Sequence, residues 1–364
     1  MKTALTLALA VALLFPVSAQ AQRAPTITVM TRNVFLGADL SPAINAQTIP
    51  QAIDGAGTVW NELQATKFAE RAVPLAREIR ASKADLVGLQ EVALWRKQTP
   101  SDGGAPPINP GASPATEVEI DFLAELRKHL GNSYRVVVVQ EEFDAELPVD
   151  ADGNDATGNA ALSGADFDAR LTMRDVILVR RGSKVKVGKT RRGHFRTRFE
   201  PTIAGLFKLP VDRGWASVEA RVGKRQFRFV NTHLEAFGDP KIREAQAKEL
   251  TRGPLKTKKQ VVLVGDLNSG VKRHNQPERP GDDLAFKALA KFGLKDNGAV
   301  QSCCYPSLFD ANAVFDHTVD HVLTKPGLRT VRAFVTGKDP SARTPSGLWP
   351  SDHGGVVSRI RLRR

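Results

Sequence analysis

Three of the seven histidines directly follow an aspartate, and all three lie near the C-terminus. The pairs are Asp316-His317, Asp320-His321 and Asp352-His353, in the segments FDHTVDHVL and PSDHGGV. An aspartate can orient an imidazole for proton transfer, but a buried histidine needs only one satisfied hydrogen bond to be purely structural. Which pair does chemistry therefore depends on the other residues that share a site with it.

Polar side chains also stand where apolar segments end. Asn33 closes the segment TITVMTRN, Glu91 follows DLVGLQ, and His233 closes QFRFVNTH. Asp266 and Asn268 follow VVLVG in the same way. Taken singly, each residue suits a turn, a helix cap or a solvated strand end. In α/β sheets, however, sites form where strand ends meet the following loops, so we expect these side chains to converge on one cleft.

This set of residue types suits hydrolysis of a phosphate ester. Carboxylate and amide oxygens without thiolates favour a hard divalent ion, Mg²⁺, Mn²⁺ or Ca²⁺, and leave room for water and a phosphate oxygen. Hydrolysis also needs a base for water, a proton donor for the leaving group, and positive or hydrogen-bonding groups around phosphorus. Asp266, His353, His233 and Asn268, with the basic residues, supply these types.

Strand and helix patterns alternate along the chain. Short Val- and Ile-rich segments bounded by polar residues predict strands, and helical periodicity predicts the helices between them. Their intermixing indicates an α/β sandwich. The predicted strands are 26–34, 85–92, 134–140, 174–181, 215–222, 226–233, 260–267, 318–323 and 356–362, and the predicted helices are 65–82, 117–130, 242–251 and 284–293.

Six short blocks of the sequence, given at the end of this paragraph in chain order, resemble the endonuclease/exonuclease/phosphatase superfamily. The resemblance runs from the first mature strand to the C-terminus. It implies a four-layer α/β/β/α sandwich of two mixed β-sheets flanked by helices, as in deoxyribonuclease I, and metal-dependent hydrolysis of phosphoesters. The blocks are RNV with Asn33, LQEV with Glu91, NTHLEA with His233, GDLNS with Asp266 and Asn268, VDHVL with Asp320, and SDHGGV with Asp352 and His353.

The resemblance also implies a metal site. Glu91 would be the principal ligand of Mg²⁺, or of Mn²⁺ or Ca²⁺, with Asn33 beside it and Asp352 near the metal. The chain further resembles a secreted bacterial branch of the superfamily, through LGADL at Leu36–Leu40 and RGW at Arg213–Trp215.

Catalytic roles follow from the same resemblance. Asp266 would orient or deprotonate water, and Asn268 would hold a phosphate oxygen. His233 would stabilise the phosphate or protonate the leaving group. His353, oriented by Asp320, would act as base or phosphate ligand, and the choice of base between His353 and Asp266 stays open.

One further acid is a candidate. The segment RDVILVR places Arg174 and Asp175 at a strand start, where nuclease-like members carry an acid that pairs with the first histidine. We therefore hypothesise that Asp175 pairs with His233. The alternative is a solvated pair at the start of the strand.

The three Asp-His pairs receive different predictions. In TVDHVL, Asp320 is expected to face the cleft and point at His353, whereas His321, the next residue along the strand, projects to the opposite face. His321 is therefore expected to be structural. Asp316-His317 precedes the strand and is expected in a loop or at the substrate rim.

The N-terminus predicts export. An apolar run over Ala4–Phe15 is followed by the small-residue pattern Ala19-Gln20-Ala21, typical of a signal peptide cleaved after residues 1–21. A membrane-spanning helix needs about 20 apolar residues, and no later segment is long enough. We expect a secreted or periplasmic protein, with no transmembrane segment after cleavage. The catalytic domain is expected over 22–364, with surface insertions near 99–116 and 141–168.

Other metal sites are less favoured. DADGND at Asp150–Asp155 resembles a calcium loop, but its glycine is misplaced and Ala161 stands where a glutamate is needed. His317 and His321 lack the helical HExxH setting of a zinc hydrolase. Cys303-Cys304, the two cysteines of the chain, can form a strained disulfide or remain a free buried pair.

The chain is strongly basic, with a net charge of +13. Nine Lys and Arg residues and no acid lie between Arg180 and Arg198, and Lys256, Lys258 and Lys259 form a second cluster. A solvated basic face explains this charge, but so does contact with nucleic acid, anionic lipid or another anionic surface.

The favoured function is a secreted, metal-dependent phosphodiesterase that cleaves nucleic acid by attack of water. The first alternative is a phospholipid phosphodiesterase of sphingomyelinase type, for which the loop GLFKLP is a candidate membrane contact. The second is a non-catalytic polyanion-binding protein. A monomer is expected in each case.

Overall fold

The computed structural model describes residues 24–104, 109, 111–153, 165–270, 280–296, 298, 300–325 and 327–362. The predicted signal peptide, residues 1–21, lies outside the described residues. Within the described part of the chain, no helix has the length and apolar character needed to cross a membrane.

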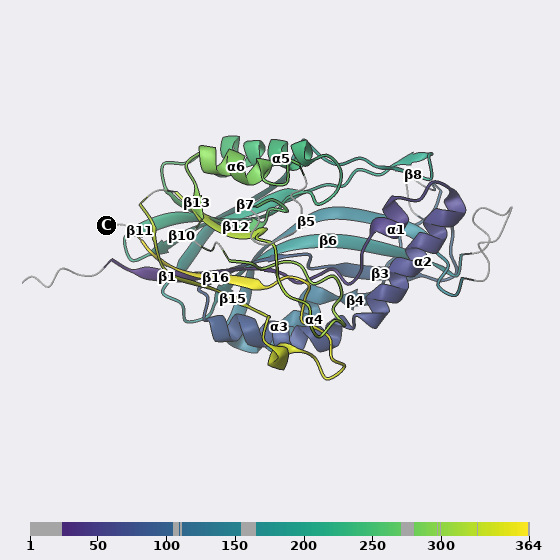
Figure 1. The fold of residues 1–364 in the computed structure, drawn as a ribbon, viewed down its shortest axis with the longest axis horizontal. Helices are drawn as coiled ribbons and strands as arrows, with labels where there is room; N and C mark the ends of the chain where they lie inside the picture. Colours follow the sequence, from purple (N-terminus) through teal and green to yellow (C-terminus); the bar gives the residue numbers. More distant parts are fainter. Residues whose placement is uncertain are drawn as a thin grey trace, which may run out of the picture.

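Two β-sheets lie face to face in the middle of the molecule, and helices cover their outer faces (Figure 1). The first sheet has the order β15 (Arg329–Thr336), β16 (Gly355–Arg361), β1 (Thr26–Asn33), β2 (Leu86–Gln90), β6 (Phe167–Arg180), β3 (Leu94–Gln98) and β4 (Glu117–Asp121), with β5 (Tyr134–Val149) also paired to β6. The second has the order β13 (Lys295–Asp296), β14 (Asp320–Thr324), β12 (Gln260–Asp266), β11 (Arg225–His233), β10 (Gly214–Val222) and β7 (Lys186–His194). Both sheets mix parallel and antiparallel pairs.

The helices form two outer layers. On the first sheet lie α2 (Ile49–Ala65), α3 (Phe68–Ser82) and α4 (Phe122–Leu130), and on the second lie α5 (Pro240–Arg252) and α6 (Leu284–Lys291). The predicted four-layer α/β/β/α sandwich is confirmed. The short elements are α1 (Ser41–Ile44), η1 (Gly131–Ser133), η2 (Pro340–Ala342) and the hairpin of β8 (Thr202–Ile203) and β9 (Phe207–Lys208).

The inner faces of the two sheets pack through apolar side chains. Leu86 and Ile177 come from the first sheet, Phe229 and Val264 from the second, and all four are completely buried. Because these strands are covered on both faces, their sequences are nearly continuous apolar runs. A polar residue that ends such a run therefore stands out in the sequence.

Strand register brings these polar ends together. β1 and β2 are parallel, and Asn33 lies beside the residue that precedes Glu91. β11 and β12 are also parallel, with His233 opposite Asp266, and antiparallel β14 places Asp320 on the other side of Asp266. Each sheet therefore contributes a group of polar residues at the ends of its strands.

The predicted helix over 117–130 is wrong in its first part. Glu117–Asp121 forms β4, which pairs with β3, and α4 begins at Phe122. Asp121 sets this boundary because its side chain accepts hydrogen bonds from Leu123 N and Ala124 N and so caps the helix.

The predicted insertion over 141–168 is shorter than expected. β5 continues to Val149 and β6 begins at Phe167, so both ends of this segment are strands that pair with each other. Residues 154–164 lie outside the described part of the chain. The other predicted insertion, 99–116, connects β3 to β4.

His321 on β14 is a structural residue in this fold. Its Nδ1 lies 2.9 Å from Asp296 Oδ2, and its Nε2 lies 2.9 Å from the carbonyl oxygen of Ser269. Both partners accept hydrogen bonds, so both ring nitrogens carry protons. Burial disfavours this charge, but the bonds to Asp296 and Ser269 outweigh burial and raise the pKa of His321 above 6.5. The ion pair joins β14 to β13, and the bond to Ser269 joins β14 to the loop after β12.

Replacing His321 with glutamine should destabilise the protein in a pH-dependent way. A histidine whose pKa is raised in the folded state contributes its full stabilisation below its unfolded pKa of about 6.5. This contribution is lost as the pH rises through the folded pKa. The difference in unfolding free energy between the parent and His321→Gln should therefore be about 1–3 kcal/mol at low pH and shrink in alkali. Urea unfolding of both proteins from about pH 5 to about pH 9 measures this difference.

The matched control is His129→Gln, on α4 and away from Asp296. This variant should track the parent at every pH. A loss for His321→Gln that stays constant from about pH 5 to about pH 9 would contradict the charged-ring assignment.

Candidate active site

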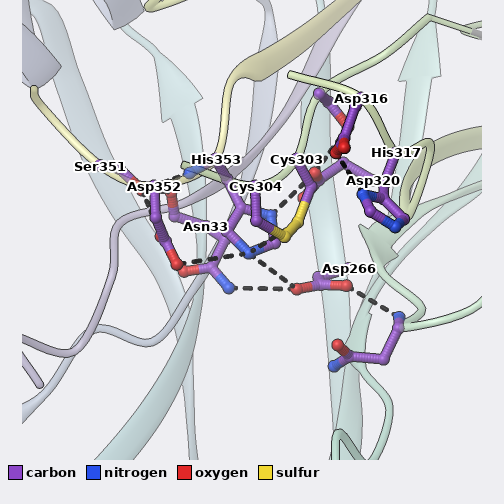
Figure 2. Close-up of a disulfide and its surroundings, with 12 residues drawn as sticks. Asn33, Asp266, Cys303, Cys304, Asp316, His317, Asp320, Ser351, Asp352 and His353 are labelled. Atoms are coloured by element: carbon purple, nitrogen blue, oxygen red, sulfur yellow. Dashed lines mark hydrogen bonds and ion pairs between the residues drawn. A yellow bond between two sulfur atoms is a disulfide. The ribbon is translucent and has the colours of Figure 1, made fainter. Parts of the chain in front are cut away.

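Side chains from both sheets and from the segment before β16 converge at one edge of the sandwich. Figure 2 shows Asn33, Asp266, Asp352 and His353 directed toward one another. The structure brings together the sequence-predicted residues Asn33, Glu91, His233, Asp266, Asn268, Asp320, Asp352 and His353.

Asn33 connects the carboxylates of the two sheets. Its Nδ2 donates to Glu91 Oε1 at 2.8 Å and to Asp266 Oδ2 at 3.1 Å, and its Oδ1 accepts from Phe35 N at 2.9 Å. Glu91 Oε2 accepts from Leu36 N at 2.8 Å. Glu91 itself has a φ of 59°, so its backbone turns sharply out of β2. The Glu91 carboxylate is thereby held in one position.

The donor set fits a hard divalent cation. Glu91 and Asp352 line the same cavity of about 370 Å³, beside the Asn33 amide. Burial raises the pKa of Asp352 to about 6; His353 opposes this shift and Glu91 adds to it. Several carboxylates therefore crowd a buried space in which they repel one another, and an oxygen-ligated cation would relieve that repulsion. Glu91, Asp352 and Asn33 are the residues that would hold such a cation.

The hydrogen bond expected between Asp320 and His353 is present. His353 Nδ1 lies 2.9 Å from Asp320 Oδ2, and Ser302 Oγ donates to the same oxygen at 2.7 Å. This pairing fixes the ring and leaves Nε2 facing Asp266 Oδ2 at 3.6 Å and Asp352 Oδ2 at 4.0 Å. Burial disfavours a charged ring, but the three aspartates raise the pKa of His353 well above 6.5.

Asp316-His317 occupies a different environment. The two side chains pair with each other in the loop before β14, and His317 is 38% exposed while Asp316 is 27% exposed. This position agrees with the predicted loop, close to Cys303 (Figure 2).

His233 pairs with an arginine rather than with the predicted acid. Arg213 Nη1 donates to His233 Nδ1 at 3.0 Å. Because arginine can only donate, the proton of the neutral ring is on Nε2, which lies 3.6 Å from Asp266 Oδ2 and 3.9 Å from Glu91 Oε1. Burial and Arg213 lower the pKa of His233 well below 6.5. The Asn268 amide nitrogen lies 3.1 Å from Nε2.

The hypothesised Asp175–His233 pair is therefore wrong. Asp175 is completely buried, and neither carboxylate oxygen has a hydrogen-bond partner among the described residues. Burial raises the pKa of Asp175 well above its ordinary value, opposed by Arg213. Arg213, and not Asp175, is the partner of His233 Nδ1.

Three supporting residues have no assigned role in the sequence prediction. Arg213 lies in the noted RGW string, but that string signals only a resemblance. Ser302, which orients Asp320, precedes the cysteine pair and belongs to no motif. Arg32 donates to the carbonyl oxygen of His353 and pairs with Glu78 at 3.2 Å. A charged residue inside an apolar strand, as at Arg32, is the signal that marks such a buried contact.

Comparison with solved structures places the fold. A structure described as an endonuclease/exonuclease/phosphatase family protein from Bacteroides thetaiotaomicron aligns over 94% of this chain and 100% of its own, with a TM-score of 0.56 and 16% identity. A mannosyl-6-phosphatase from B. thetaiotaomicron VPI-5482 aligns over 92% and 99%, with a TM-score of 0.51 and 16% identity. D. rerio TDP2 humanized by 14 mutations aligns over 92% and 98%, with a TM-score of 0.50 and 16% identity.

Sequence comparison gives the family. No curated protein matches the chain significantly. The profile of the Endonuclease/Exonuclease/phosphatase family matches residues 59–353, which contain all the predicted site residues except Asn33. Members of this family hydrolyse phosphoesters, so the site belongs to a hydrolase acting on phosphoester bonds. The chain belongs to the Endonuclease/Exonuclease/phosphatase family.

Proposed function

We propose that this protein is an exported, divalent-metal-dependent phosphodiesterase that cleaves nucleic acid. The observation that carries the proposal is one connected set of polar side chains. The Asp320–His353 pair faces Asp266 through Nε2 of His353. The Asn33 amide then connects Asp266 to Glu91. A bound Mg²⁺ would polarise a phosphate oxygen and neutralise developing charge.

The side chains divide the remaining work. Asp266 Oδ2 can accept the proton of the attacking water, and the charged His353 ring, whose Nε2 lies 3.6 Å from that oxygen, can donate to the same water or to the phosphate. His233 presents its Nε2 proton to the same cleft, because Arg213 occupies the other nitrogen. It can donate that hydrogen bond to a phosphate oxygen or to the leaving group. The Asn268 side chain lies beside it, with its amide nitrogen 3.1 Å from His233 Nε2 and donating to Leu234 O at 3.0 Å.

The surface charge supports a polyanionic substrate. Lys186, Lys189 and Arg191 are exposed along β7, the edge strand of the second sheet. β7 pairs with β10, whose Gly214 end leads directly to Arg213 in the site. Edge strands often carry charge simply to prevent aggregation, but a basic strand that runs toward the cleft also suits a phosphate backbone.

The cavity beside Glu91 supports recognition of a ring. Its lining includes Phe35, Phe237, Tyr305 and Phe309. Aromatic side chains stack on nucleobases without strong sequence preference. A base next to the cleaved phosphate would fit this environment.

Phospholipid is the second candidate substrate. Four large apolar side chains of the described residues are more than half exposed: Leu206 at 64%, Phe309 at 54%, Val314 at 71% and Val118, on β4, at 56%. Leu206 lies in the β8–β9 hairpin, within the predicted GLFKLP loop. Exposed apolar side chains of this kind can enter a membrane interface.

Replacement of site residues should abolish cleavage while leaving the fold intact. With Mg²⁺ at low salt, the parent should cut plasmid DNA and RNA, and EDTA should stop it. Glu91→Gln, His353→Ala and Asp320→Asn should each lower the rate by about 10²–10⁴-fold, because each removes a metal ligand or a proton-transfer group. Gel assays with circular dichroism of each variant provide the measurement.

His129→Ala and Glu117→Gln are matched controls, since both positions lie outside the site. They should retain the parent rate. Release of phosphocholine from sphingomyelin vesicles without any cut nucleic acid would replace the favoured substrate by the second candidate. Absence of hydrolysis of every phosphoester with Mg²⁺, Mn²⁺ or Ca²⁺ would refute the enzyme proposal.

Charge reversal on β7 should weaken cleavage of long nucleic acid selectively. Lys189→Glu/Arg191→Glu should raise KM for duplex DNA and reduce the salt slope by about 1 per lost phosphate contact. Hydrolysis of bis-p-nitrophenyl phosphate, too small to reach β7, should stay unchanged. The control Lys241→Glu/Lys291→Glu makes the same charge change on α5 and α6. Equal effects of the two double variants would show that net charge, not β7, is responsible.

A further inference from the structure

A vicinal cysteine pair lies against the catalytic histidine. Cys303 and Cys304 form a disulfide, and Cys303 Sγ is 3.7 Å from His353 Nε2 (Figure 2). Cys303 is 1% exposed, whereas Cys304 is exposed to solvent. Neither sulfur has a part in the proposed hydrolysis, although Cys303 Sγ is in contact with the His353 ring.

Backbone hydrogen bonds hold this segment in place without help from the disulfide. Ser302 N and Cys303 N both donate to His317 O, at 2.8 and 3.2 Å, and His317 N donates back to Cys303 O at 2.7 Å. Tyr305 N donates to Asp352 O at 2.9 Å. After reduction, the two sulfurs would therefore remain beside His353.

The spacing of Cys303 Sγ and the His353 ring suits a tetrahedral thiophilic metal, and Cys304 Sγ, bonded to Cys303 Sγ in this structure, moves away from it once reduction breaks that bond. Sγ of Cys303, Sγ of Cys304 and one ring nitrogen of His353 all lie within 4.8 Å of one another. Zinc bonds of about 2.3 Å to sulfur and about 2.0 Å to nitrogen place a sulfur and a nitrogen ligand about 3.5 Å apart. The observed 3.7 Å between Cys303 Sγ and His353 Nε2 is close to this value.

The second nitrogen of the ring is already held as a zinc ligand requires. Asp320 Oδ2 lies 2.9 Å from His353 Nδ1, and Ser302 Oγ fixes that carboxylate at 2.7 Å. Metal-binding histidines usually donate their other nitrogen to such an acceptor, which orients the ring and increases its basicity. A fourth position remains for water from the cleft.

We propose that, in the reduced protein, Cys303, Cys304 and His353 form a binding site for a thiophilic divalent cation such as Zn²⁺. Thiolate ligands select softer metals than Mg²⁺, so this site differs in chemistry from that of Glu91 and Asp352. Its occupation withdraws Nε2 of His353 from hydrolysis. The inhibitory part of the proposal rests on the proposed function; the binding part does not.

Reduction creates the ligands. A dithiol reductant breaks the Cys303–Cys304 bond, its own two thiols become a disulfide, and both cysteines gain a proton. Each thiol, and Nε2 of the charged His353 ring, then releases its proton to the buffer when the cation binds. The exposed Cys304 sulfur gives the reductant access. The disulfide form offers no thiolate and therefore does not bind the metal.

Cadmium titration of the full chain tests the binding. With excess Mg²⁺ present, the reduced parent should bind one Cd²⁺ with thiolate-to-metal ultraviolet absorbance, whereas the disulfide form and Cys303→Ser/Cys304→Ser should show none. Asp320→Asn should weaken Cd²⁺ binding by about 10–100-fold, because the ring loses its orienting partner. Absence of thiolate absorbance in the reduced parent, or an affinity unchanged in His353→Ala, would overturn the site.

Zinc inhibition tests the consequence. Each protein is compared with its own rate in Mg²⁺ alone. Stoichiometric Zn²⁺ should remove most of the activity of the reduced parent and little of that of Cys303→Ser/Cys304→Ser. Equal inhibition of both would overturn the inhibitory role. If neither protein hydrolyses any phosphoester, the proposed function fails together with the inhibitory part, while the Cd²⁺ titration still decides the metal site.

Discussion

The amide group of Asn33 is the interaction on which the site depends. It donates to Glu91 from its own sheet and to Asp266 from the opposite sheet, and it is completely buried. A carboxamide is suited to this position because one nitrogen carries two donors, which satisfies two acceptors at once without adding charge. An aspartate there would add a third negative group to two that already repel each other.

A second amide bridge lies deeper between the sheets. Gln90 Nε2 donates to Asn231 Oδ1 at 2.6 Å, and Asn231 Nδ2 donates to Leu89 O at 3.0 Å. Gly88 makes this bridge possible, since a Cβ there would lie 2.2 Å from Asn231 Oδ1. The spacing of the sheets near the site is thus determined by paired polar groups and not by apolar packing alone.

Arg213 illustrates how a buried charge supports the chemistry. Glu235, Glu91, Glu142 and Asp175 all act on it, and together they outweigh burial and keep its pKa raised. Burial in turn raises the pKa of Glu142 well above its ordinary value. The arginine therefore remains charged at the centre of an acidic group and serves as the fixed donor to His233. Such a cluster is costly to bury, which points to a role in positioning rather than in stability.

Much of the fold and of the site could be predicted from the sequence because the strands are buried on both faces. A polar residue at the end of an apolar run, such as Glu91 or Asp266, is visible without a structure. Arg213 and Ser302 were given no role because they lie outside the apolar runs, where periodicity carries no information.

Secondary structure was missed where packing overrides local preference. Helix α2 contains Gly55 and Gly57, which weaken its helical signal. An added Cβ at Gly57 would lie 1.7 Å from the carbonyl oxygen of Asp150, so close packing requires the glycine. Strand β7 was missed because, as an exposed edge, it lacks apolar alternation.

The pairing of β1 with β16 has a consequence for synthesis of the protein. Thr26 lies opposite Arg361, and Ser351 Oγ donates to Asn33 O across 318 positions of the chain. A ribosome must therefore synthesise β16 before β1 can pair with it, although β2 is available on the other side of β1 much earlier. Until then the unpaired side of β1 is an open template for other strands. Assembly of Asp352 and His353 with the other polar side chains and protection of β1 from foreign strands would therefore be acquired in the same late step.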